Sequence, residues 1–258
     1  MAGSVVSADG TVIGYESLGE GPPLLLVHGS TATRARWAPV RSRLAQRYTV
    51  YDIDRRGRGM STAEAGSYSL GREAEDVAAV AAALGGNVYV LGHSYGALCV
   101  MEAAVITSAF RRMVLYEPPM PAPGLDVISP DALARLKTMT DPELILETFY
   151  REALQLPQSA INGMKGTAIW QARLSAAHTI TREFDQVNAY RATDRLTKID
   201  VEVRMLLGTE SPSYLRAATA AFAAQIPGAT IVALQGQAHQ AIDSDPGQFV
   251  HSVIDFDT

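Results

Sequence analysis

One short segment, GHSYG at residues 92–96, has the residue types and spacing for nucleophilic chemistry. It follows the apolar run VYVL and precedes an alanine-rich segment, so Ser94 falls at a predicted strand–turn–helix corner. At such a corner the serine is strained so that its hydroxyl stands clear of the sheet, and side chains two places before or after would collide with neighbouring elements. Gly92 and Gly96 remove those side chains. Free amides at the start of the following helix favour a developing negative charge.

The elements that must position this corner alternate along the chain. Short β-rich runs are separated by alanine-rich segments of helical length, which is typical of an α/β fold with helices on both faces of a parallel sheet. The carboxylates of Glu73, Glu75 and Asp76 are expected on the solvated face of one helix. The strand candidates are Thr11–Ser17, Pro23–Val27, Thr49–Ile53, Val88–Leu91, Met113–Tyr116, Glu202–Leu207 and Thr230–Leu234, and the helix candidates are 37–45, 70–84, 97–106, 214–226 and 245–254.

One long segment interrupts the alternation. A proline-dense stretch, 117–124, is followed by about 70 residues of helical character before the next strand candidate. This length exceeds an ordinary connection, so we predict a helical cap inserted into the sheet domain. The predicted boundaries are 1–118 for the first part of the core, 119–195 for the cap and 196–258 for the second part of the core.

Composition excludes several classes of function. The 258 residues carry a net charge of −5 with scattered basic residues, so we expect no nucleic-acid partner. Cys99 is the only cysteine, and no His, Asp and Glu cluster has ligand spacing, so we predict neither a metal nor a cofactor. No apolar run reaches the roughly 18 residues of a membrane span, and the first residues do not resemble a secretory leader. We therefore expect a soluble, cytoplasmic protein; the sequence indicates no oligomeric state.

Four motifs in this order resemble those of the α/β-hydrolase superfamily: VHGS at 27–30, DRRGRGMS at 54–61, GHSYG at 92–96 and GQAH at 236–239. The likeness covers nearly the whole chain. It implies an α/β-hydrolase fold, with a mostly parallel eight-stranded sheet flanked by helices and a helical cap after the sixth strand. It also implies a Ser–acid–His catalytic triad.

The resemblance implies roles for further residues. A serine needs a base to take its proton, and the family keeps that base where His239 follows the last strand candidate. The backbone amides of Ser30 and Tyr95 are the expected oxyanion hole. His28 is expected to hold its loop in shape, and His93 to pack beside the nucleophile.

The acid that orients the base is open between two glutamates. The commonest family pattern has Gly-x-x-Asp after the seventh strand, but this chain has Ser211 at the aspartate's place and Glu210 one residue earlier. Some members, such as certain haloalkane dehalogenases, place the acid after the sixth strand, where this chain has Glu117. Pro118 favours an extended backbone at Glu117 and should fix its carboxylate at the ligand-binding edge of the sheet. We predict Glu117 as the acid, with Glu210 as the alternative.

These residues predict a serine hydrolase that cleaves a carboxylic ester or related acyl bond of a small, hydrophobic molecule through an acyl-enzyme on Ser94. Lactonase, thioesterase and C–C hydrolase activities would use the same arrangement. Trp37, Trp170 and Met139 are predicted to contact the substrate, with few charges near the mouth of the pocket. The alternative is a non-hydrolytic protein, of ligand-binding or cyclase and lyase type, that uses the same capped pocket.

Overall fold

A single twisted sheet organises the molecule. The computed structural model describes residues 1–62 and 66–257, and in these residues eight strands lie in the order β1-β2-β4-β3-β5-β6-β7-β8. Strand β2 pairs antiparallel with both β1 and β4, and from β4 to the other edge at β8 all neighbouring strands pair in parallel. The strands are β1 (Ala2–Val6), β2 (Val12–Leu18), β3 (Pro23–Val27), β4 (Thr49–Ile53), β5 (Val88–His93), β6 (Phe110–Tyr116), β7 (Glu202–Gly208) and β8 (Thr230–Leu234).

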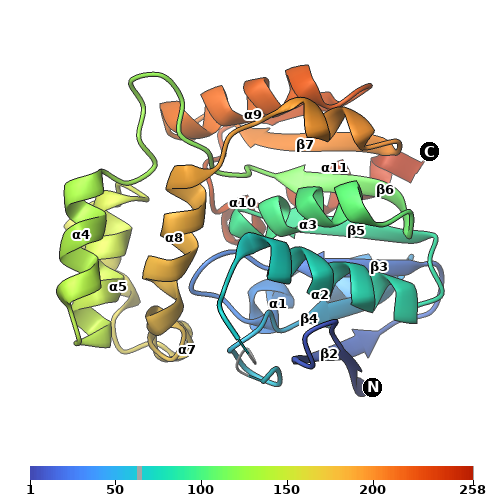
Figure 1. Cartoon of the computed structure of the whole chain (residues 1–258), viewed down its shortest axis with the longest axis horizontal. Helices are drawn as coiled ribbons and strands as arrows, with labels where there is room; N and C mark the ends of the chain where they lie inside the picture. Colours follow the sequence, from blue (N-terminus) through green and yellow to red (C-terminus); the bar gives the residue numbers. More distant parts are fainter. Residues whose placement is uncertain (63–65, 258) are drawn as a thin grey trace.

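Helices cover both faces of the sheet (Figure 1). Alternate residues of β3 enter different cores: Leu25 and Val27 pack on one side, Leu24 and Leu26 on the other. Because both faces of the sheet are buried, every position of a central strand such as β3 is apolar. Such a continuous apolar run is recognisable in the sequence. One face carries α2 (Leu70–Ala83), α3 (Tyr95–Ile106) and α9 (Ser213–Gln225); the other carries α1 (Ala38–Leu44), α10 (Ala241–Ser244) and α11 (Pro246–Ile254).

The segment between β6 and β7 is helical and stands beyond one end of the sheet, at the left of Figure 1. Ser129 and Asp141 cap its first two helices with their side chains, and each is followed by a proline at the first helical position. In the described part of the chain, no helix is both long and apolar enough to cross a membrane. The helices are α4 (Pro130–Thr138), α5 (Pro142–Glu152), α6 (Gln158–Met164), α7 (Ala168–Leu174) and α8 (Ile180–Ala189).

The predicted fold class is confirmed, and so are the predicted strands, three of them with their observed bounds. Strand β1 was not predicted, because its residues AGSVV form an edge strand that is half exposed along its length and lacks a long apolar run. Helix α3 was predicted to start at Ala97, whereas it begins at Tyr95, directly after Ser94.

The corner between β5 and α3 confirms the predicted need for two glycines. A Cβ on Gly96 would lie 2.3 Å from the carbonyl oxygen of Val27, and one on Gly92 would lie 2.6 Å from the Cα of Ala97. Both contacts are with backbone, which cannot swing aside as a side chain can. The two glycines therefore allow α3 to start against the end of β3.

Gly96→Ala should lower the free energy of unfolding by about 2–3 kcal/mol, because the added methyl group forces α3 away from β3. Gly71→Ala, near the start of α2, is the matched control: its Cβ would meet only the Ser69 hydroxyl, at 3.6 Å, and the change should stay within about 1 kcal/mol. Denaturant unfolding of both variants tests this, and equal stabilities would contradict it.

Candidate active site

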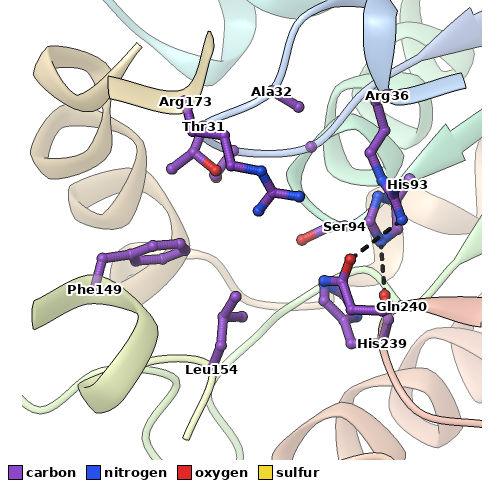
Figure 2. Close-up of a pocket in the computed structure, with 12 residues that line it drawn as sticks. Thr31, Ala32, Arg36, His93, Ser94, Phe149, Leu154, Arg173, His239 and Gln240 are labelled. Atoms are coloured by element: carbon purple, nitrogen blue, oxygen red, sulfur yellow. Dashed lines mark hydrogen bonds between the residues drawn. The ribbon is translucent and has the colours of Figure 1, made fainter. Parts of the chain in front are cut away.

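Ser94 occupies a strained backbone position at the end of β5. Its φ is 55° and its ψ is −125°, outside the regions that residues with a side chain normally adopt. Its amide donates to the carbonyl of Tyr116, 2.8 Å away, which ties the corner to β6. The hydroxyl projects into a small cavity that His239 also lines (Figure 2). The strain thus exposes one hydroxyl where a substrate could reach it.

His239 is paired with Glu117. The Nδ1 of His239 lies 2.6 Å from Oε2 of Glu117, whose side chain is fully buried. The other carboxylate oxygen, Oε1, accepts from the Gly208 amide at 2.7 Å and from the Ser211 hydroxyl at 2.5 Å. Both oxygens of the buried carboxylate are therefore satisfied, and the imidazole is held by a group that cannot turn away.

The backbone at Glu117 differs from the expectation. Its φ is +48°, so it is not extended in spite of Pro118. Its amide donates to the carbonyl of Leu206 at 3.3 Å, and its carboxylate reaches the end of β7. These fixed contacts outweigh the local preference that a following proline imposes.

Glu210, the alternative acid, is exposed, and its amide donates to the carbonyl of Gln237 at 2.8 Å. Ser211, at the place of the usual aspartate, is buried against Glu117. The chain thus has a serine at the usual place of the acid after β7, and the carboxylate that this serine contacts comes from the end of β6 instead. This role of Ser211 was not predicted, although its place in the motif, where the aspartate usually stands, was the available signal.

Two aromatic side chains from the ends of β5 and β6 hold the loop that carries His239. The Tyr116 hydroxyl donates to the carbonyl of Ala238 and accepts from the Ala241 amide at 3.0 Å. The His93 ring stacks on Tyr116, with centroids 4.9 Å apart, and its Nε2 donates to the His239 carbonyl at 3.3 Å. Burial and the neighbouring His239 lower the pKa of His93, so it serves this loop as a neutral ring.

The expected oxyanion donors lie on either side of Ser94. Tyr95 is the first residue of α3, where helix amides lack intrahelical acceptors. Ser30 lines the same cavity as Ser94, and a Cβ on the preceding Gly29 would lie 2.9 Å from the Ser94 Cβ. The loop after β3 therefore touches the candidate nucleophile directly.

His28 fixes this loop, as predicted. Its Nδ1 donates to the Gly29 carbonyl at 2.9 Å, and its Nε2 accepts from the Arg55 amide at 3.1 Å. Burial, with the charges of Arg58 and Arg55, lowers its pKa well below the usual range. The ring is neutral and fully engaged, so it joins two loops and takes no part in proton transfer.

A buried ionic cluster joins the cap to the same loops. Glu183, from α8, is fully buried and pairs with Arg55 at 2.7 Å and with Arg58. Burial by itself would raise the pKa of Glu183, but the two arginines and a hydrogen bond from the Ser30 hydroxyl lower it to about 2. A side chain of the cap thus contacts the residue whose amide is an expected oxyanion donor.

The acidic residues of α2 were misassigned. Glu73 and Asp76 are buried, not solvated: Glu73 pairs with Arg55 at 2.6 Å, and Asp76 with Arg56 at 2.7 Å. The arginines of the DRRGRG turn supply the charges that make this burial possible. Only Glu75 lies nearer the surface.

The cavity at Ser94 is lined differently from the prediction. Trp37 and Trp170 are buried in the two cores, and Met139 packs against one of them, so none of the three lies in the lining. Burial in the core stabilises these three side chains, and the large apolar residues that do line the cavity are Phe149 and Leu154. Figure 2 shows two arginines beside them, Arg36 from the 3₁₀ helix Arg34–Trp37 after β3 and Arg173 from α7. The expectation of few charges at the mouth is therefore wrong.

Comparisons with known proteins identify the family. Residues 24–252 match the family described as "Alpha/beta hydrolase family", and the chain belongs to that family. An α/β hydrolase from Sphaerobacter thermophilus has 31% sequence identity and a TM-score of 0.86, over 99% of this chain and 100% of that one. An esterase from a Rhodococcus species has 29% identity and a TM-score of 0.79, over 99% of this chain and 98% of that one.

A curated relative, N-formylmaleamate deformylase from Pseudomonas putida, is 39% identical over 128 residues. The match covers 48% of this chain and 48% of that protein, so the chain spans about half the length of this relative. The predicted family is confirmed by these matches.

Glu183→Gln tests the ionic cluster, because it leaves the Arg58 guanidinium buried without a counter-charge. The pKa of Glu183 in the folded protein, about 2, lies below its ordinary value of 4.5. The carboxylate therefore contributes its full stabilisation above about pH 4.5, and this contribution decreases as the pH falls towards 2. We expect the variant to lose about 3 kcal/mol of unfolding free energy at pH 7, and less at pH 4 and pH 3.

Denaturant unfolding at pH 7, 5.5, 4 and 3 measures this dependence. Asp185→Asn is the control on the same helix, since both side chains of its ion pair with Lys137 are nearly half exposed and the pair should contribute under about 1 kcal/mol. A loss in Glu183→Gln that stays constant across the pH range would contradict the assignment.

Proposed function

We propose that the protein is a serine hydrolase that cleaves an ester or amide-type acyl bond of a small molecule through an acyl-enzyme on Ser94. The observation that carries the proposal is the buried Glu117–His239 pair, 2.6 Å apart, beside a strained serine in one cavity. The name of the deformylase relative, which acts on N-formylmaleamate, supports including amide-type bonds alongside esters.

In this mechanism His239 exchanges protons with Ser94. Nδ1–H donates to Glu117, which leaves Nε2 unprotonated and able to accept the serine proton as the oxygen attacks the carbonyl carbon. The amides of Ser30 and Tyr95 stabilise the negative charge that develops on the carbonyl oxygen. His239 then protonates the leaving group, and the carbon–leaving group bond breaks.

The second half of the cycle repeats these steps with water. His239 takes a proton from a water molecule, whose oxygen attacks the acyl-enzyme carbonyl, and then returns a proton to Ser94 as the acid product leaves. Glu117 remains ionised throughout and stabilises the protonated imidazole. Its bonds from the Gly208 amide and the Ser211 hydroxyl, both to Oε1, hold the carboxylate in place behind the imidazole.

Ser94→Ala should reduce kcat/KM at least about 1,000-fold for a series of p-nitrophenyl esters from acetate to octanoate, because the acyl-enzyme cannot form. Ser4→Ala, an exposed serine on β1, is the control and should leave the rates unchanged. Equal turnover by Ser94→Ala would contradict the proposal. Saturable ligand binding without any turnover would favour the non-hydrolytic alternative.

The acid assignment predicts unequal effects for two glutamates. Glu117→Gln should lower kcat about 100-fold or more, since a neutral amide neither holds the imidazole in the required tautomer nor stabilises its charge. Glu210→Gln should change kcat less than about twofold, because that side chain is exposed. Steady-state kinetics with a thermal unfolding check on both variants compares them, and the reverse ranking would sink the assignment.

A further inference from the structure

The cavity at Ser94 carries an excess of positive charge. Two guanidinium groups, those of Arg36 and Arg173, line it, and none of its described lining residues is an aspartate or glutamate. Glu117 lies behind His239 and is already bonded there. An anionic group of a ligand would therefore find two cations and no competing carboxylate in the cavity wall.

Arg36 is buried although its charge is only partly compensated. Its Nη1 donates to Asp243 at 2.7 Å and its Nη2 to Gln240 at 3.2 Å, whereas the buried Nε has no hydrogen-bond partner within the described ranges. Asp243 is 43% exposed, so water weakens its interaction with Arg36. Burial lowers the pKa of Arg36; Asp243 raises it and the charge of Arg173 lowers it again. The two guanidinium groups thus repel each other across the cavity.

Arg173 has no acidic partner among the residues that the structure describes. It donates to the Tyr150 hydroxyl and lies over that ring, 5.5 Å from its centroid. A tyrosine orients a guanidinium without neutralising it. Figure 2 shows the Arg173 guanidinium pointing from the cap into the cavity, on the side where Ser94 lies.

The two arginines stand where two cavities meet. Both line the small cavity at Ser94, of about 30 Å³, and a neighbouring cavity of about 630 Å³ between the cap and the loop after β3. Thr31, Ala32 and Gln240 also border both. Residues such as Met164, Ile169 and Leu156 make much of the larger cavity apolar. Any molecule that extends from Ser94 into this cavity passes the two cations.

We propose that Arg173 and Arg36 form a carboxylate-binding subsite, so that the acyl compound cleaved at Ser94 carries a carboxylate a few bonds from the scissile carbonyl. This inference rests on the proposed hydrolase function, whose substrate class it names. A guanidinium presents two parallel N–H donors that match the two oxygens of a carboxylate.

Ligands that cannot be hydrolysed test the subsite apart from catalysis. Levulinate and 5-oxohexanoate place a ketone and a carboxylate on chains of two lengths, and 2,5-hexanedione and 2,6-heptanedione are neutral counterparts with a methyl ketone in place of the carboxylate. Calorimetric titration of the wild-type protein measures all four affinities. The keto acid that binds more tightly should have an affinity at least about 10-fold higher than that of its neutral counterpart.

Arg173→Gln should reduce this keto acid affinity about 10- to 100-fold and leave the diketone affinity nearly unchanged. Arg173→Lys keeps the charge but loses the forked donors, so its keto acid affinity should lie between those of Arg173→Gln and wild type. Arg151→Gln is the matched control, since this cap arginine on α5 is 49% exposed and outside the cavity lining. Its keto acid affinity should equal that of wild type.

Three results would overturn the subsite: equal affinities for keto acids and diketones, an unchanged keto acid affinity in Arg173→Gln, or tighter binding of the phosphonate that matches levulinate. Failure of the hydrolase proposal is a separate result. It would be seen as ester turnover that does not depend on Ser94, whereas the preference for a keto acid over its diketone reports on the subsite alone.

Discussion

The backbone at Ser94 is the constraint on which the site depends. A residue with a side chain at φ 55° and ψ −125° costs of the order of 1–3 kcal/mol, and it persists only where surrounding packing allows no alternative. Here the amide is tied to Tyr116, and the ends of β3 and α3 approach so closely that Gly29 and Gly96 have no room for a Cβ. The close approach that forces the strain also brings the expected oxyanion donors beside the hydroxyl.

The histidine loop depends on the same sheet edge. Tyr116 and Glu117 are consecutive at the end of β6, yet one holds the backbone on either side of His239 and the other holds its ring. His93, at the end of the adjacent β5, supports the same loop. Because neighbouring strands lie about 4.8 Å apart, groups at their ends meet at distances that the sheet itself sets. The position of His239 is therefore set at the edge of the sheet.

Features that depend on local backbone geometry could be predicted from the sequence, whereas the environments that side chains reach through tertiary packing could not. The glycines around Ser94 and the serine itself have fixed spacing, so they could be recognised without a structure. Trp170 and Arg173 lie on the same short helix, and nothing in their spacing indicates that the tryptophan enters the core while the arginine faces the cavity. The charges of α2 were misassigned for a similar reason, because their partners lie in a distant turn.

Glu183 makes the cap a part of the hydrolase core rather than an exchangeable module. Its carboxylate is the cap's contribution to a cluster whose arginines belong to the core, and it also receives the hydroxyl of the loop beside Ser94. A cap transplanted from another hydrolase without this carboxylate would bury Arg58 uncompensated and release the loop. Changes of cap in this lineage therefore require matching changes in the turn after β4, and the two segments are expected to diverge together.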